Sequence, residues 1–232
     1  MTGYPDRGLH GQVVQEVGRR IVSGAEPPGS ILDIEHLEAT FDVSKTVVRE
    51  ALKVLAAKGL VDARPKRGTF VRPRADWSLL DPDLLRWQFE SSARDQFLTN
   101  LHEVRLIVEP AGARLAAVRR TDDDLAALEG TLTLVPAEAS PEEIVEADLA
   151  FHRTLLAASH NELLARMEHI IEIGLRARDL LVHAAGHRED FLPPHQAVLA
   201  AVRSGDPDAA ERAMRGLLDQ AARDQAELGG AP

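Results

Sequence analysis

The chain has 232 residues, of which 44% are hydrophobic, 28% are charged and 4% are aromatic. That length supports one large core or two smaller ones, built mainly from aliphatic side chains. The lack of cysteine excludes a disulfide framework and a thiolate zinc site, and no apolar run approaches the roughly 20 residues that span a membrane. We therefore expect a cytoplasmic protein with no membrane partner.

The net charge of −10 is unevenly distributed along the chain. Residues 45–74 contain nine Lys and Arg but two acidic residues, whereas residues 75–232 contain fifteen basic and twenty-eight acidic residues. A basic segment on an acidic body is typical of a DNA-contacting domain joined to a domain that does not touch DNA. A solvated charge run would look the same by charge alone, so local patterns must decide.

The first 74 residues show helical spacing followed by a short hairpin. Apolar residues at helical spacing predict three helices, over residues 9–23, 34–40 and 44–58. Ser44 is placed as the N-cap of the third helix, and Gly59 follows its end. Two β-like runs, 60–63 and 69–71, then flank a basic turn. Three helices and a two-stranded wing predict a winged helix-turn-helix domain over residues 8–74.

The remainder of the chain is predicted to be all-helical. Residues 75–90 are expected to form a linker and a first connecting helix, and residues 91–228 a helical bundle. From Phe97 to Val118, apolar residues alternate spacings of four and three, Ala111 among them, which favours one long helix packed through this stripe. Further helices are expected over residues 121–135, from 140, and over 162–184, 195–204 and 207–227. Ser140 and Glu143 are placed as the capping box that opens the helix from 140.

The third predicted helix carries the candidate DNA contacts. The start of a recognition helix enters the major groove, where short polar and basic side chains reach base edges and phosphates. On the hairpin, Lys66 and Arg67 lie at the predicted wing tip, and Gly68 lets the backbone approach the minor groove. An ordinary solvated helix face is the alternative for the helix residues. The helix residues predicted to face DNA are Ser44, Lys45, Thr46 and Arg49.

A second group of polar residues falls on apolar faces of the predicted bundle. Asp148 and His152 are four residues apart on one helix, with apolar neighbours on that face. His195 is followed at helical spacing by Val198 and Leu199, so it also points inward. One Asp and two His suit a divalent metal that keeps open positions. A hydrogen-bonded His–Asp pair in the core explains the same spacing equally well.

The string from Asp42 to Leu52, continued by Gly59-Leu60-Val61 and the Gly68 wing, resembles the GntR family of bacterial regulators. The resemblance implies a dimer that binds a palindromic operator in double-stranded DNA. Two positions depart from the family pattern. Lys45 stands where Arg is usual, and Glu35 where many members have a phosphate-contacting Arg.

Residues 104–110, 146–161 and 194–202 resemble the FCD ligand-binding domain of the FadR branch of that family. The resemblance implies that Asp148, His152 and His195 bind a metal, zinc or nickel, and that an Arg helps to hold a carboxylate effector. Arg105 is the first candidate for that Arg and Arg176 the second, with a surface ion pair as the alternative for each. The family's last-helix His is replaced by Leu217, so a metal-free pocket stays open as an alternative.

Residues 77–87 and 108–111 are similar to the sugar-acid branch of the family, the galactonate-operon repressor type. That similarity implies a sugar acid such as galactonate or gluconate as effector. We expect a homodimeric repressor that leaves DNA when its effector binds. We do not expect an enzyme. The alternatives are activation, a response to another carboxylate such as lactate, and an architectural DNA-binding protein without a ligand. A further alternative is a metal-dependent hydrolase or lyase acting on a sugar acid or lactone.

Overall fold

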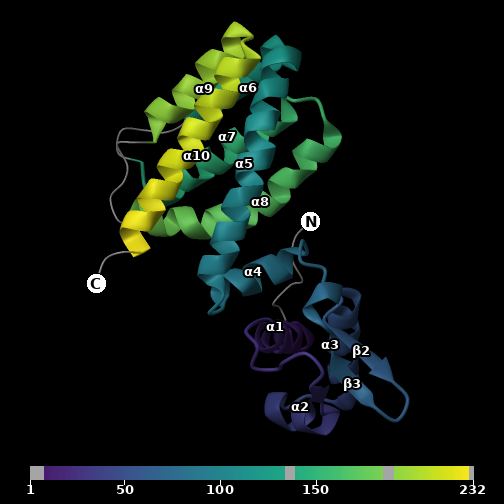
Figure 1. Ribbon diagram of the computed structural model, residues 1–232. Coiled ribbons are helices and arrows are strands. Elements are labelled where there is room, and N and C mark those ends of the chain that lie inside the picture. Colours follow the sequence, from purple (N-terminus) through teal and green to yellow (C-terminus); the bar gives the residue numbers. More distant parts are fainter. Residues whose placement is uncertain (1–7, 134–138, 185–190, 230–232) are drawn as a thin grey trace. The chain divides into compact units, whose positions relative to one another are not determined.

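The computed structural model describes residues 8–133, 139–184 and 191–229 (Figure 1). The chain forms two compact units, Met1–Phe97 and Leu98–Pro232. Within the described ranges, no helix combines the length and the apolar character needed to cross a membrane.

The first unit contains three helices and a small antiparallel sheet. The helices are α1 (Leu9–Val22), α2 (Ile34–Phe41) and α3 (Lys45–Ala57). The strands are β1 (Ile31–Leu32), β2 (Val61–Arg64) and β3 (Gly68–Val71), in the order β1-β3-β2. The predicted winged helix-turn-helix fold is therefore confirmed, with one strand more than the two predicted. A strand of two residues is too short to show an alternating pattern in the sequence.

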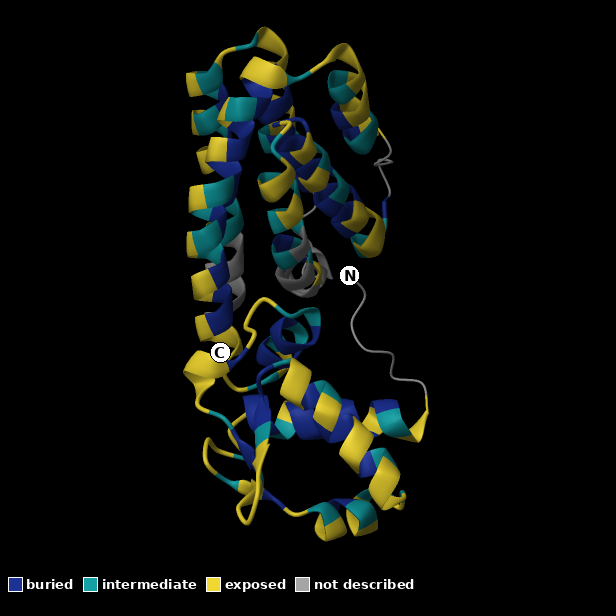
Figure 2. Cartoon of the chain, turned by 90° about the vertical axis from the view of Figure 1, so that its right-hand side faces the viewer, coloured by how far each residue is buried: buried dark blue, intermediate teal, exposed yellow. Residues whose placement is uncertain are grey.

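The helices of this unit bury their apolar faces against one another (Figure 2). Val13, Val17 and Ile21 of α1 share one core with Val48 and Leu55 of α3. Burying aliphatic side chains of this size contributes about 1.5–3 kcal/mol each. This packing fixes the direction of α3, so the opposite face of α3 is left to solvent.

The segment predicted as linker and connecting helix, residues 75–90, lies within the first unit. It contains most of a short 3-10 helix (Arg74–Asp76) and all of α4 (Pro82–Glu90). Trp77 and Trp87 belong to the same hydrophobic core as α1 and α3. Residues 75–90 are thus a structural part of the first unit.

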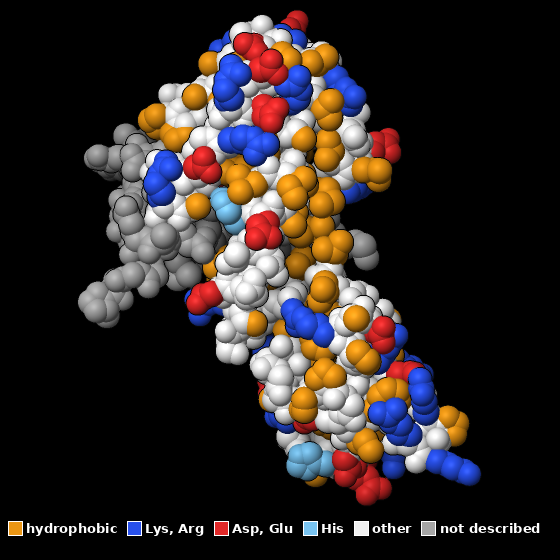
Figure 3. Space-filling view, in the orientation of Figure 1, with side chains coloured by type: hydrophobic (Ala, Val, Ile, Leu, Met, Phe, Trp, Pro, Cys, Tyr) orange, Lys and Arg blue, Asp and Glu red, His pale blue; other side chains and the backbone are white. Residues whose placement is uncertain are grey.

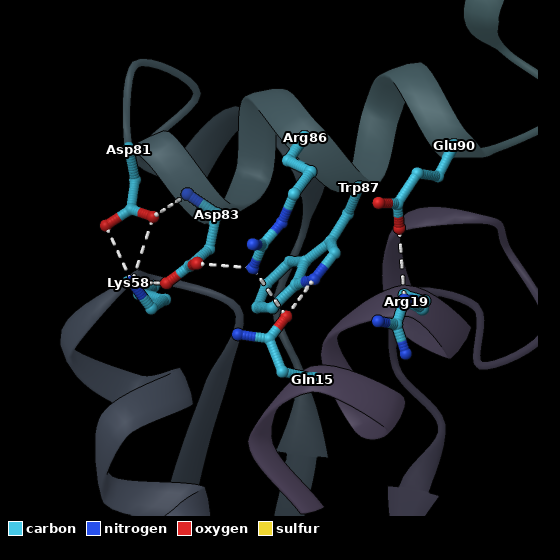
Figure 4. Close-up of polar contacts among 8 residues, drawn as sticks. All are labelled: Gln15, Arg19, Lys58, Asp81, Asp83, Arg86, Trp87 and Glu90. Carbon is cyan, nitrogen blue, oxygen red and sulfur yellow. Dashed lines mark hydrogen bonds and ion pairs between the residues drawn. The ribbon is translucent and has the colours of Figure 1, made fainter. Parts of the chain in front are cut away.

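α4 is held against α1 by close packing and by polar contacts. Gly18 of α1 lies under Trp87, so close that an added Cβ would be 2.3 Å from the indole ring. The indole Nε1 donates a hydrogen bond to Gln15 Oε1 at 2.8 Å (Figure 4). Arg19 also donates to Glu90 at 3.1 Å. The side-chain volume missing at Gly18 is what allows Trp87 to sit there.

A buried ion network ties the start of α4 to the end of α3 (Figure 4). Lys58 Nζ lies 2.7 Å from Asp83 and 2.9 Å from Asp81. Arg86 donates to Asp83 at 2.9 Å and to Gln15 at 2.8 Å. Burial would lower the pKa of Lys58, but its bonds to Asp83 and Asp81 outweigh burial and raise that pKa. The charge on Lys58 therefore compensates the fully buried carboxylate of Asp83.

The helices of the second unit match the predicted bundle. They are α5 (Arg94–Arg119), whose first residues precede the unit boundary, α6 (Asp122–Thr133), α7 (Pro141–Ala157), α8 (Glu162–Ala184), α9 (Leu192–Ser204) and α10 (Pro207–Gly229). The predicted capping box of Ser140 and Glu143 opens α7. α9 begins three residues before His195, where the helix was predicted to start. Among the residues described, no strand follows Val71.

The buried face of α5 differs from the predicted stripe. Ala111 and Val118 were expected to be buried, but both are exposed. In this half of the helix the buried residues are small ones such as Ala113 and Ala117. A Cβ added at Gly112 would lie 2.5 Å from the side chain of Leu156, so α5 approaches α7 closely there. Small residues mark the packed face here, and a count of large apolar residues misses it.

Candidate DNA-binding surface and candidate metal and effector site

The residues predicted to face the major groove lie together at the start of α3. Ser44, Lys45, Thr46 and Arg49 are all exposed. Ser44 occupies the N-cap position, as predicted, but its side chain makes no capping hydrogen bond. Lys45 Nζ lies 3.8 Å from the carboxylate of Glu35 on α2. An acidic side chain therefore sits beside one of the predicted contacts, at a position already noted as a departure from the family pattern.

The wing presents its basic residues on the β2–β3 turn. Lys66, Arg67 and Gly68 are exposed, and Lys66 and Gly68 adopt left-handed backbone angles, with φ of 64° and 82°. The guanidinium of Arg67 stacks over the ring of Phe70 at 3.8 Å, and that of Arg64 lies 5.4 Å from the same ring. Figure 3 shows Lys and Arg side chains gathered on this end of the first unit.

Arg64 and Phe70 were not among the predicted site residues. The alternating pattern of the hairpin places both on one face of the sheet, because Asp62 pairs with Phe70 and Arg64 with Gly68. Stacking on an aromatic ring limits the rotamers that an Arg side chain can adopt. Phe70 therefore holds the guanidinium of Arg67 in a defined orientation at the wing.

In the second unit, the three predicted metal ligands come together from two helices. Asp148, His152 and His195 are buried, and their candidate ligand atoms lie within 4.8 Å of one another. His195 Nε2 is 2.9 Å from Asp148 Oδ1, and His152 Nε2 is 3.5 Å from the same oxygen. The spacing of four residues on α7 and the inward face of α9 account for this meeting.

The two imidazoles present the same nitrogen to Asp148. His195 Nδ1 lies 2.6 Å from the backbone carbonyl of Phe191, which leaves Nε2 facing the carboxylate. His152 Nδ1 lies near a side-chain carboxylate oxygen instead, Glu109 Oε2 at 2.7 Å. A carbonyl or carboxylate on one ring nitrogen fixes the other nitrogen as a metal ligand. Asp148 Oδ2 is buried and has no hydrogen-bond partner in the described structure, so it is suited to serve as a cation ligand.

Helix α5 adds two charged residues to this cluster of Asp148, His152 and His195. Arg105 and Glu109 are one helical turn apart and both buried, with exposed fractions of 2% and 0%. Arg105 Nε donates to Glu109 Oε1 at 2.5 Å. Glu109 Oε2 lies 2.7 Å from His152 Nδ1, but the angle is outside hydrogen-bond geometry. Arg105 Nη2 lies 3.3 Å from His152 Nε2. Arg105, the first effector candidate, therefore lies next to the predicted metal ligands.

Glu109 was missing from the predicted site, although the sequence contains a signal for it. It follows Arg105 by four residues, so an acidic and a basic residue share one face of a long helix. The residues on either side of this face are apolar. A buried acidic and a buried basic residue there must therefore neutralise each other. A buried Arg105 needs a nearby negative charge, and Glu109 is the acidic residue on the same helix face.

Charges within the cluster support one another. Burial would raise the pKa of Glu109, but Arg105 and His152 outweigh burial and lower it to about 2. Burial of Asp148 is likewise outweighed by His152 and His195, so its pKa lies well below the usual range. Burial would lower the pKa of His152, yet Glu109 and Asp148 raise it to about 9. The two buried carboxylates thus attract positive charge, which a proton or a metal ion can supply.

Arg176, the second effector candidate, is not part of this cluster. It lies on α8, its side chain is 46% exposed, and it forms ion pairs with Glu146 and Glu172. The arrangement matches the surface ion pair considered as the alternative for this residue. Arg105, by comparison, makes buried contacts with Glu109 and His152.

Two family models match the two units in order. Residues 9–71 match "Bacterial regulatory proteins, gntR family", and residues 100–220 match the FCD domain. The chain belongs to the GntR family. With its FCD domain, it is a transcriptional regulator of that family and not an enzyme.

Known relatives of this GntR chain are transcriptional regulators. The galactonate operon transcriptional repressor of Escherichia coli K12 is 34% identical, over 94% of this chain and 96% of its own length. LutR, a transcriptional regulator of Bacillus subtilis 168, is 32% identical over 84% of this chain and 90% of its own. The Uxu operon transcriptional regulator of Escherichia coli K12 is 28% identical over 86% and 81%.

Solved structures show the same GntR fold. A GntR protein of Streptococcus agalactiae aligns with a TM-score of 0.51 at 25% identity, over 94% of this chain and 99% of its own. Lar, which controls the Listeria monocytogenes agr system, aligns with a TM-score of 0.66 at 18% identity, over 96% and 98%. At 18% identity, the similarity to Lar concerns the fold alone.

Proposed function

We propose that the chain is a cytoplasmic, homodimeric repressor that binds a palindromic operator and is released by a sugar acid such as galactonate or gluconate. The observation that carries the effector part is the buried cluster of Arg105, Asp148, His152 and His195, which gathers carboxylate-binding and metal-binding groups in one place. The 34% identity to a galactonate operon repressor supports the choice of a sugar acid.

DNA binding is assigned to the exposed surface of α3 and the wing. Ser44, Lys45, Thr46 and Arg49 would read and hold the major groove, while Lys66, Arg67 and Gly68 would follow the minor groove. One winged domain makes few base contacts and binds weakly, so two copies on a palindrome account better for specific recognition.

In the effector unit, Asp148, His152 and His195 would hold a divalent metal, zinc or nickel. Three protein ligands leave further positions open, and Leu217 adds none, because its side chain is apolar. A bound ion would act as a Lewis acid for carboxylate and hydroxyl oxygens of the effector. Arg105 would contribute the fixed positive charge that a carboxylate needs in a buried site.

The test is operator binding by fluorescence anisotropy, with full-length protein, zinc and DNA from upstream of its own gene. Galactonate, gluconate and lactate are each titrated. We expect salt-sensitive binding that galactonate or gluconate relieves and lactate does not. His195→Ala should keep DNA affinity but lose the response, whereas Gln196→Ala, an exposed neighbour, should behave as wild type.

Three results would contradict parts of the proposal. Tighter DNA binding in the presence of a sugar acid would make the protein a co-repressor-dependent regulator or an activator. DNA binding that no sugar acid changes would remove the effector assignment, while leaving the regulator itself intact. A His195→Ala variant that still responds would remove the metal assignment.

A further inference from the structure

His195 and His152 obtain their orientation in different ways. His195 Nδ1 faces a backbone carbonyl four residues earlier in the chain, at Phe191. His152 lies within α7, where the carbonyls are used by the helix itself. Its Nδ1 instead lies 2.7 Å from a carboxylate oxygen of another helix, Glu109 Oε2, at an angle outside hydrogen-bond geometry. One imidazole is thus oriented by the backbone and the other by a side chain.

Glu109 is itself held in place by Arg105. The guanidinium Nε contacts Glu109 Oε1 at 2.5 Å, and Nη2 lies 3.4 Å from Oε2. A carboxylate held at both oxygens has little freedom to rotate. Since both residues are buried, solvent does not screen the pair. The contacts form a series from Arg105 to Glu109 to His152, leading from α5 to α7.

We propose that Glu109 is the positioning residue of this site, whose carboxylate turns His152 so that Nε2 faces Asp148 and His195. This inference rests on the metal role proposed above for those three residues. Glu109 does not belong to the group whose ligand atoms lie within 4.8 Å of one another, and its oxygens contact Arg105 and the Nδ1 side of His152 instead. Arg105 consequently supports the ligand set before any effector arrives.

Outer partners of metal-ligating His residues typically change metal affinity by about 10- to 100-fold when they are lost. The amide of Glu109→Gln keeps the shape of the side chain but has one acceptor oxygen instead of two. That oxygen can replace Oε1 beside Arg105 Nε or Oε2 beside His152 Nδ1, but it cannot replace both. We therefore expect zinc affinity of the full-length protein to fall by about 10- to 100-fold in this variant.

The experiment is a competition titration of Zn²⁺ against a chelator, with Glu103→Gln as the matched control. Glu103 lies on the same helix and is exposed, so its variant should bind zinc as wild type does. A visible spectrum of the Co²⁺ form gives a second readout that lost stability alone would not move. We expect the Glu109→Gln spectrum to change and the Glu103→Gln spectrum to match wild type.

Side-chain ¹H–¹⁵N NMR covers the case in which Glu109→Gln fails to fold. In zinc-loaded wild-type protein we expect His152 to carry its proton on Nδ1 and the metal on Nε2. Metal on Nδ1, or zinc affinity and Co²⁺ spectrum unchanged in a folded Glu109→Gln variant, would overturn the inference. Wild-type protein that binds no zinc would remove the proposed metal and this positioning role together, whereas the other two outcomes remove only the positioning role.

Discussion

The two functional regions of this protein use charged residues in opposite ways. On α3 and the wing, Lys45, Arg49 and Lys66 are exposed and have at most weak ion pairs, so their charge is free for a partner. In the bundle, Arg105 and Glu109 are buried, and each satisfies the other. Losing an exposed charge should therefore affect binding alone, whereas losing a buried one should affect folding as well.

This difference follows from solvation. An exposed guanidinium is hydrated in the free protein and gives up part of that hydration only when DNA arrives. A buried guanidinium has lost its water at folding, so its protein partners must replace that water in every state. Under the proposed function, the same residue type is thus a recognition group in one unit and a structural group with a binding role in the other.

The largest expected effect is on stability, in the buried pair. Arg105→Met should cost about 3–5 kcal/mol in the free energy of unfolding, because it leaves the carboxylate of Glu109 with less compensation. The measurement is urea denaturation of the metal-free protein. The double variant Arg105→Met with Glu109→Gln should recover most of the loss, since both buried charges are then gone. Equal losses in the single and double variants would show that the charge pair is not what stabilises this region.

A second prediction concerns the packing of α4 on α1. Gly18→Ala places a methyl group 2.3 Å from the rigid indole of Trp87, so we expect a loss of about 1–3 kcal/mol in the free energy of unfolding. Gly216→Ala on α10 is the control, because its Cβ would enter open space and should stabilise that helix by about 0.5–1 kcal/mol. Similar thermal midpoints for the two variants would mean that Trp87 is not packed on Gly18 in solution.

The sequence predicted the elements well where a local pattern determines them. The helices of the bundle and the capping box of Ser140 followed from apolar spacing and terminal residues. β1 and the buried alanine face of α5 did not, because one is too short for a pattern and the other depends on close helix approach. Asp148, His152 and His195 could be grouped from their faces and the family resemblance. The place of Glu109 in the site could not be predicted in this way, because it depends on which residues contact the buried Arg105.

A third prediction concerns the exposed side of the comparison. Arg49→Ala should weaken operator binding by about 1–3 kcal/mol, or about 5- to 150-fold, because it removes a contact at the start of the recognition helix. The free energy of unfolding should stay within about 0.5 kcal/mol of wild type, since Arg49 is exposed. Arg166→Ala, an exposed Arg of the second unit, makes the same charge change and should leave operator affinity unaltered. An Arg49→Ala variant that binds normally would remove α3 as the recognition helix.

The smallest expected effect concerns the wing, where charge should act without reading sequence. Lys66→Ala should weaken binding to operator and to unrelated DNA by the same factor, because a phosphate contact carries no base information. Its signature is the salt dependence, since one lost phosphate contact lowers the slope of log affinity against log salt by about 1. Anisotropy at several salt concentrations measures that slope. If Lys66→Ala instead weakened operator binding alone, the wing would take part in sequence recognition, and the exposed charges of the first unit would divide into two kinds.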